Sequence, residues 1–348
     1  MSSTHVVVDP DQVPGTYAYH RLARTRPGAR WWRPLLVGLL AGALYVALLG
    51  AGVVVLTVAS LTSGPGGLER LGALDVTDLR DPFVFTLAML SIIAMLPAVL
   101  VAARLLGARP VGLLASVTGR VRWGWAARCL ALSAVLALVV QGADAALAAA
   151  AGTPWQPRPD GTTWVFVGLV LLLVPAQCVA EEVVFRGYLV QTLGAWLRHP
   201  AFAILLPVPL FVAGHTYVGL AMVDTAVWAI AMGWLVWRTG GLEAAAAAHV
   251  VNNVVVFGLG SVSLVDLDVV DIPPVALAVS TASTLVYVAL VEVLVRRSRV
   301  ARVRVVDPPV PPPAGVSDGA SAGAPPGTAG ALPAGPGGPV VPVPSPPS

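Results

Sequence analysis

The sequence has no lysine, only two cysteines and few charged residues of either sign. Charged residues make up 11% of the 348, against about 25% in an ordinary soluble domain. Hydrophobic residues make up 57%, which is more than a soluble globule of this size can hide from water. These features exclude a soluble enzyme, a nucleic-acid-binding protein and a disordered protein as descriptions of the whole chain. They leave a polytopic membrane protein.

The two cysteines, Cys129 and Cys178, both lie in apolar runs. Two such residues form neither a disulfide framework nor a zinc cluster, and small buried side chains are the simpler interpretation. The first apolar run begins only near Leu35, after an arginine-bearing arm over residues 1–33. Because this run is too long for the core of a cleavable signal peptide, we expect no such peptide.

Long apolar runs are what the sequence has in place of charge. A helix needs about 20 apolar residues to cross the hydrocarbon core of a bilayer. The sequence therefore predicts an all-α, polytopic membrane helix bundle of about eight transmembrane helices, and one fewer if the fifth or sixth segment is re-entrant. The candidate spans are Leu35–Leu61, Phe83–Leu106, Ala126–Ala151, Thr163–Leu189, Ala201–Leu220, Met222–Trp237, Leu242–Leu259 and Pro274–Val295.

Arginine excess alternates from loop to loop along the chain. Arginines dominate before the first span, between the second and third, around residues 186–198 and after the last, while aspartates dominate most of the intervening loops. Loops on the cytoplasmic side of a membrane carry the excess of positive charge. Both termini are therefore expected in the cytoplasm, which requires an even number of spans.

Proline, glycine, alanine and serine dominate residues 307–348. Such a segment cannot form a packed core, and we expect a disordered tail. Its Pro-Pro steps could dock in an SH3-like groove, although a low-complexity spacer is the simpler interpretation. We divide the chain into a cytoplasmic arm (1–33), a transmembrane domain (34–297) and a cytoplasmic tail (298–348) that is first basic, then rich in proline, glycine and alanine.

Polar residues within the apolar runs carry the functional signal, because a polar group inside a membrane is costly. Glu181 and Glu182 are adjacent in the fourth run, and Arg186 lies one helical turn after Glu182. This spacing lets Glu182 and Arg186 pair on one helix face, while Glu181 points about 100° away. Glu181 is then free for chemistry, unless both glutamates merely lie among lipid headgroups at a helix end.

Two further clusters follow along the chain. Phe211 and His215 are four residues apart, and His249 and Asn253 share a helix face by the same spacing. Asn252 and Asn253 are the only asparagines in the chain. A lone histidine in a membrane helix is more often a packing residue than a catalyst. Together, however, a free carboxylate, two imidazoles and an amide on three helices provide the groups of a hydrolytic site.

The three clusters resemble a known signature. Glu-Glu-x-x-x-Arg, Phe-x-x-x-His and His-x-x-x-Asn, in this order, are typical of the CPBP family, also called the Abi or CAAX protease family, which includes the type II CAAX prenyl endopeptidases. Here the motifs stand at residues 181–186, 211–215 and 249–253, and the Phe-Arg-Gly-Tyr-Leu run at 185–189 is also similar to the family. The resemblance does not extend to the N-terminal arm or to the tail.

The resemblance implies an intramembrane endopeptidase of a bacterial cytoplasmic membrane, which hydrolyses peptide bonds of membrane-associated peptides or proteins. It implies that Glu181 activates a water molecule with the help of His215, and that His249 and Asn253 stabilise the oxyanion. Its implied structural residues are Glu182, Arg186 and Phe211. The expected partners are the lipid bilayer and the peptide or membrane-protein substrate, and no nucleic acid.

The use of a metal is left open by the sequence. Glu181, His215 and His249 could ligate zinc and leave one coordination position open. A metal-free water molecule activated by a glutamate fits the same residues. Zinc and a metal-free site therefore stand as equal alternatives.

The depth of each motif can be compared. At about 1.5 Å per residue, Glu181 and His249 lie roughly 10–12 Å from the cytoplasmic ends of their spans, and His215 roughly 21 Å if its helix is continuous. Pro207 and Pro209 remove the mismatch if they break that helix. We therefore predict a broken fifth span, a site that opens towards the cytoplasm, and His215 within about 10 Å of Glu181, since catalytic groups must share hydrogen-bond reach.

Two other functions would use the same residues. A catalytically inactive relative would serve as a membrane scaffold or immunity-type protein. A proton-coupled transporter would use Glu181, His215 and His249 as a relay, although the sequence has no evident internal repeat.

Overall fold

The computed structural model describes residues 4–6, 14–25, 30–107 and 110–307. The chain divides into two compact units, Met1–Pro309 and Val310–Ser348. The predicted disorder of the proline-rich tail and its docking to an SH3-like partner concern residues 308–348, which lie outside the described part. The predicted domain boundaries stay predictions.

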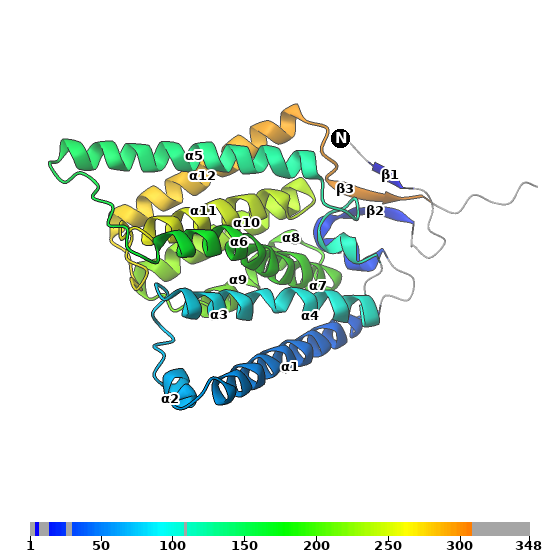
Figure 1. The fold of residues 1–348 in the computed structure, drawn as a ribbon. Helices are drawn as coiled ribbons and strands as arrows, with labels where there is room; N and C mark the ends of the chain where they lie inside the picture. Colours follow the sequence, from blue (N-terminus) through cyan, green and yellow to red (C-terminus); the bar gives the residue numbers. More distant parts are fainter. Residues whose placement is uncertain (1–3, 7–13, 26–29, 108–109, 308–348) are drawn as a thin grey trace, which may run out of the picture. The chain divides into compact units, whose positions relative to one another are not determined.

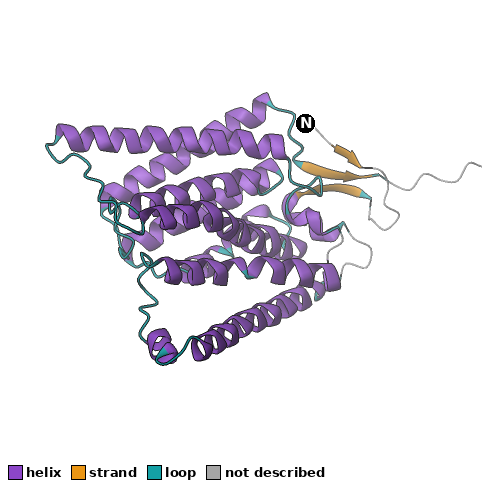
Figure 2. Cartoon of the chain, viewed as in Figure 1, coloured by secondary structure: helices purple, strands orange, loops and turns teal. Residues whose placement is uncertain are grey.

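Helices dominate the described part of the chain, as Figures 1 and 2 show. The predicted all-α helix bundle is confirmed. The α-helices are α1 (Arg33–Thr62), α2 (Gly67–Gly72), α3 (Pro82–Ile93), α4 (Met95–Ala102), α5 (Trp123–Ala150), α6 (Thr163–Glu181), α7 (Val190–Trp196), α8 (Pro200–Leu205), α9 (Val208–Ala213), α10 (Gly219–Thr239), α11 (Glu243–Gly260) and α12 (Pro274–Arg297). The 3₁₀ segments are η1 (Tyr19–Arg24) and η3 (Val111–Leu114), and the π-helical segments are η2 (Ala103–Gly107) and η4 (Glu182–Leu189).

Among the described residues, 7 helical stretches are long and apolar enough to cross a membrane. They are α1, α5, α10, α11 and α12, together with the continuous stretches Pro82–Gly107 and Thr163–Trp196. Their outer faces are apolar; α1, for example, buries only Val37 and leaves Leu39 and Val46 70% and 67% exposed. An apolar surface of this extent is a liability in water, whereas it suits contact with lipid.

The fifth predicted span, Ala201–Leu220, is broken, as Pro207 and Pro209 predicted. It forms the two short helices α8 and α9, and α9 begins directly after Pro207 with Pro209 in its first turn. Proline fits the first turn of a helix, where its missing N–H would have no partner, whereas in the interior it removes a hydrogen bond. His215 was expected on a helix, and this expectation was wrong. The helix α9 ends at Ala213, and His215 lies in the connection to α10.

A small sheet joins the two ends of the described chain, and no strand was predicted there. The strands are β1 (Thr4–Val6), β2 (Gly15–Ala18) and β3 (Val303–Val306). β3 is central, parallel to β1 and antiparallel to β2, with Thr16 opposite Val305. The pairing places the first and last described segments side by side at one end of the bundle (Figure 1). The predicted even number of spans stays a prediction, and so does the cytoplasmic location of this end.

The segment that follows β2 is packed into the bundle. Tyr19 and Leu22 of η1 are fully buried, and the Tyr19 hydroxyl donates a hydrogen bond to the carbonyl of Leu114. η1 packs against α7, where a side chain at Gly194 would overlap the backbone of His20. The close approach explains why a residue without a Cβ atom occupies this position.

A buried ion pair fixes the start of α11. The Arg122 side chain contacts both carboxylate oxygens of Glu243, at 2.8 Å from Nε and 2.5 Å from Nη2. Its Nη1 donates to the backbone carbonyls of Thr239 and Ala301, at 2.9 and 2.7 Å. One arginine therefore joins the starts of α5 and α11 to the segment before β3. Since α11 packs against α5 and α6, this clamp helps to position the His-x-x-x-Asn motif that α11 carries.

Candidate active site

The adjacent glutamates lie where a regular α-helix gives way to a π-helical turn. α6 ends at Glu181 and η4 begins at Glu182. Single π-helical turns inside α-helices are rare and recur at functional sites. Glu182 is fully buried and Glu181 is 8% exposed. The two carboxylates therefore lie inside the protein rather than among lipid headgroups.

One oxygen atom of Glu182 holds two neighbouring side chains. Its Oε1 accepts a hydrogen bond from Nη1 of Arg186 at 3.1 Å, which is the i, i+4 pair expected from the spacing. The same Oε1 lies 2.9 Å from Nδ1 of His249 on α11. Since a carboxylate can only accept, Nδ1 of the imidazole carries the proton in this contact. Glu182 therefore fixes the orientation of the His249 ring.

The His249 ring stands between the two glutamates. Its Nε2 lies 3.4 Å from Oε2 of Glu181, a close approach that does not have the geometry of a hydrogen bond. Oε2 of Glu181 is buried and has no hydrogen-bond partner among the described residues. A buried polar atom without a partner is costly. This oxygen is therefore suited to accept a proton from a molecule that enters the site.

His215 lies in the connection between α9 and α10. Its Nδ1 lies 2.8 Å from the carbonyl oxygen of Phe211, and its ring stacks on Tyr217 at 5.5 Å between centroids. No hydrogen bond or ion pair in the described part of the chain joins His215 to Glu181. The imidazole in contact with Glu181 is that of His249, and the expected proximity of His215 stays a prediction.

Asn253 is brought to α6 by a residue that the sequence analysis did not single out. Its Nδ2 donates to Oε1 of Gln177 at 3.4 Å, while its own Oδ1 accepts from Asn252 at 3.1 Å. Gln177 is buried and lies one helical turn before Glu181. The signal for Gln177 was present in the sequence, because it is a polar residue at i, i+4 spacing from a glutamate within an apolar run.

Two aromatic rings hold the guanidinium group of Arg186. Its central carbon lies 4.1 Å from the centroid of Phe211 and 5.0 Å from that of Trp228, distances typical of cation–π contacts. Trp228 also packs edge-on against His249, at 4.7 Å between centroids. Phe211 of the second motif therefore contacts Arg186 of the first. Trp228 was missed, because a tryptophan within an apolar run has no feature that separates it from a lipid-facing one.

The candidate zinc ligands Glu181, His215 and His249 do not form a three-ligand site. Within the ranges that the structure describes, no group of three or more His, Cys, Asp or Glu side chains is arranged to hold a metal ion. The Nδ1 atoms of His249 and His215 are engaged with Glu182 and with a backbone carbonyl on α9, which leaves the Nε2 atom of each ring for other contacts. The choice between zinc and a metal-free water molecule stays a prediction.

All three motifs fall within one segment that matches a known family. Residues 162–255 match the family model described as "Type II CAAX prenyl endopeptidase Rce1-like". Over this segment the chain is similar to the Rce1-like proteins. The resemblance inferred from the motifs is therefore confirmed. The apolar helices, together with the Rce1-like segment, indicate a multi-pass membrane protein.

A relative with a wider match is "Uncharacterized protein YyaK" from Bacillus subtilis (strain 168). It is 28% identical over 190 residues, which are 52% of this chain and 62% of YyaK. The match thus spans less than two thirds of that protein. No solved structure matches the chain. The Rce1-like segment supports protease activity at the level of the family.

Proposed function

We propose that the protein is an intramembrane endopeptidase that hydrolyses peptide bonds of membrane-associated peptides or proteins with a water molecule activated by Glu181. The observation that carries the proposal is the buried Oε2 of Glu181, which lies 3.4 Å from His249 and has no hydrogen-bond partner in the described part of the chain. The similarity of residues 162–255 to Rce1-like endopeptidases supports the same reaction class.

Glu181 acts first as a general base and then as a general acid. Its carboxylate accepts a proton from the water molecule while the water oxygen attacks the scissile carbonyl carbon. The carboxylic acid then gives this proton to the leaving amine as the C–N bond breaks. Such proton transfers require the groups to be within hydrogen-bond reach. Burial among the helices keeps bulk water away from the reacting groups.

His249 and Asn253 stabilise the negative charge that develops on the carbonyl oxygen. Preorganised donors in a dry site contribute strongly to such stabilisation. Because Nδ1 of His249 already donates to Glu182, the oxyanion role requires a second proton on Nε2. His215 acts on Glu181 through the water molecule, from the connection between α9 and α10.

We propose that the arginine-rich side of the bundle, which also carries the sheet, faces the cytoplasm of a bacterial cell and that the site opens to this side. The alternation of arginine-rich and aspartate-rich loops supports this orientation. The pairing of β2 with β3 supports the placement of both ends of the described chain on the same side of the membrane.

A cleavage assay tests the proposal. The full-length protein in detergent is given a panel of membrane-associated peptides with varied sequences, and cleavage is followed by mass spectrometry. We expect the wild type to cleave some of them, and Glu181→Gln to be about 100- to 10,000-fold slower, because a general base contributes this much. Glu69→Gln is the matched control, since Glu69 is exposed on α2, and its rate should stay at the wild-type level.

The same experiment separates the other functions. Cleavage that persists in Glu181→Gln contradicts the assigned role of Glu181. Proton-coupled uptake by vesicles without cleavage indicates a transporter. A cellular effect that survives Glu181→Gln, with no cleavage by either protein, indicates a scaffold.

A further inference from the structure

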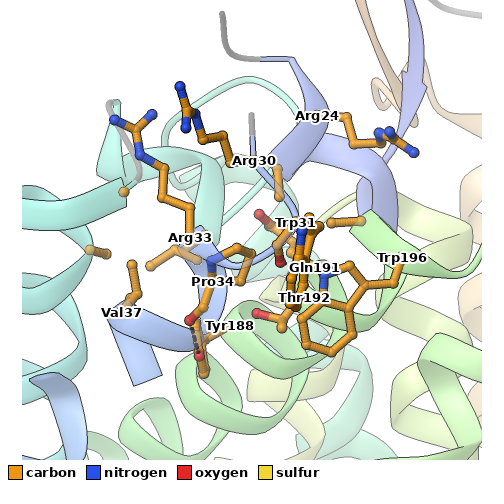
Figure 3. Close-up of a pocket in the computed structure, with 15 residues that line it drawn as sticks. Arg24, Arg30, Trp31, Arg33, Pro34, Val37, Tyr188, Gln191, Thr192 and Trp196 are labelled. Carbon is orange, nitrogen blue, oxygen red and sulfur yellow. Dashed lines mark hydrogen bonds between the residues drawn. The ribbon is translucent and has the colours of Figure 1, made fainter. Parts of the chain in front are cut away.

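A cavity lies away from the glutamates, where the N-terminal segment meets α1 and α7 (Figure 3). Its volume is about 100 Å³, several times what a single water molecule needs. Residues of η1, the start of α1, η2 and α7 line it. None of them belongs to the three motifs, so the cavity is a separate feature of the molecule.

Three arginines lie along one rim of this cavity. Arg24, Arg30 and Arg33 line it, and Figure 3 shows their guanidinium groups on the same side of it. All three are exposed, and none forms an ion pair with a carboxylate of the described residues. The rim is therefore strongly cationic, and an anion that enters it meets no competing negative partner.

Much of the remaining lining is apolar and aromatic. Val37, Ala103 and Leu114 form an apolar patch, and Trp31 and Trp196 add two indole rings. Val37 belongs to α1 and Ala103 to the stretch Pro82–Gly107, both of which can span a membrane. Tryptophans concentrate at membrane–water interfaces. The cavity thus combines a cationic rim with an apolar patch at the end of two membrane-spanning stretches.

Hydrogen bonds hold the cavity walls in place. The Tyr188 hydroxyl donates to the Pro34 carbonyl at 2.7 Å, and Nε1 of Trp196 donates to the Trp31 carbonyl at 2.8 Å. Both bonds connect the helix that follows the glutamates to the start of α1. The shape is therefore fixed by the fold and is not a chance gap between mobile side chains.

We propose that this cavity binds the headgroup of an anionic phospholipid, with the phosphate at the arginine rim and the acyl chains directed along the apolar patch. Arginine pairs strongly with phosphate oxygens, and basic pockets between membrane helices are suited to anionic headgroups. A free phosphate ion would use the same arginines but not the apolar patch. The binding is independent of the proposed peptidase activity.

Lipid titration tests the proposal. The delipidated full-length protein in neutral detergent is titrated with phosphatidylglycerol, and in parallel with phosphatidylcholine and with inorganic phosphate. Lipid binding is measured by native mass spectrometry and by the apparent melting temperature, which a ligand of the folded state raises. We expect phosphatidylglycerol to bind and to raise the melting temperature, and the other two to have little effect.

Variants test whether phosphatidylglycerol binds in this cavity. Arg30→Gln with Arg33→Gln should weaken phosphatidylglycerol binding by about fivefold for each arginine removed. Ala195→Trp, which fills the cavity without a change of charge, should weaken it as well. The matched control is Arg297→Gln with Arg299→Gln, since these two arginines are exposed and lie outside the cavity lining.

Three results would overturn the proposal. An equal effect of phosphatidylcholine would show that the headgroup charge is not recognised. An equal effect of inorganic phosphate would show that the site takes the ion and not the lipid. An equal loss of affinity in the control variant would show that the attraction is general to the basic surface.

Discussion

At the scale of single residues, Gln177 links the two halves of the candidate site. It lies one turn before Glu181 on α6, and its side-chain oxygen accepts a hydrogen bond from Asn253 at 3.4 Å. This bond and the one from Asn252 together orient the amide of Asn253. Gln177 is therefore a positioning residue for the amide that we assign to the oxyanion.

Replacing Gln177 by methionine removes the acceptor but keeps the length of the side chain. We expect kcat to fall by about three- to tenfold, the equivalent of one hydrogen bond, with KM unchanged. Asn253→Ala should cost more, and the double variant Gln177→Met/Asn253→Ala should be no slower than Asn253→Ala alone. Steady-state kinetics of the four proteins checks this, and additive losses would contradict a positioning role.

The residues of the site were predictable to different extents. Glu182 and Arg186 pair as their spacing predicted, because an i, i+4 contact depends only on the local helix. The partner of Glu181 could not be predicted in the same way. His249 lies beside Glu181 because α11 packs against α6. The sequence pattern does not indicate which of the two histidines makes this contact.

At the scale of elements, the start of α11 depends on a residue far away in sequence. Arg122 binds Glu243 through two nitrogen atoms and holds two backbone carbonyls besides. Both side chains are almost entirely buried. Loss of one partner would leave an uncompensated charge in the interior, which costs far more than loss of an exposed pair.

Arg122→Ala should therefore destabilise the protein by about 3–5 kcal/mol and lower its melting temperature in detergent. The exposed pair Arg80–Asp266, with atoms 3.7 Å apart, provides the control, since Arg80→Ala should cost about 0–1 kcal/mol. Thermal unfolding of both variants checks the difference. Equal melting temperatures would show that the buried pair is not a clamp.

Elements were predicted well where one residue type dictates the backbone. Pro207 and Pro209 break the fifth segment because two prolines this close together remove two backbone donors from one helical turn. The single Pro175, by contrast, is accommodated inside α6. The end of α9 at Ala213 was not predicted, and the strands were missed as well. Val303–Val306 is a short run whose burial depends on partners at the other end of the chain. A short pattern of this kind does not specify its partners.

At the scale of the whole molecule, the first and last described segments form one sheet. β3 pairs with β2 in antiparallel register, with Thr16 opposite Val305. Together with the buried face of η1, this sheet makes the N-terminal segment part of the transmembrane unit. Composition alone could not reveal this contact, because the pairing joins residues from the two ends of the described chain.

A crosslink tests the register. In Thr16→Cys/Val305→Cys the two side chains face each other and are close enough for a disulfide, so mild oxidation should join them. Tyr17→Cys/Val305→Cys should crosslink far less, because successive side chains point to opposite faces of a strand. A gel shift after reaction with a maleimide reports the result, with the native cysteines Cys129 and Cys178 both buried. Equal crosslinking of the two variants would contradict the register.

The position of β3 between β1 and β2 also constrains biosynthesis. A ribosome makes β2 before the first membrane helix and β3 only after the last one. Until β3 emerges, β2 has no hydrogen-bonding neighbour in the sheet, and an unpaired strand edge invites wrong partners. Closure of the sheet therefore marks the moment at which every helix has been inserted.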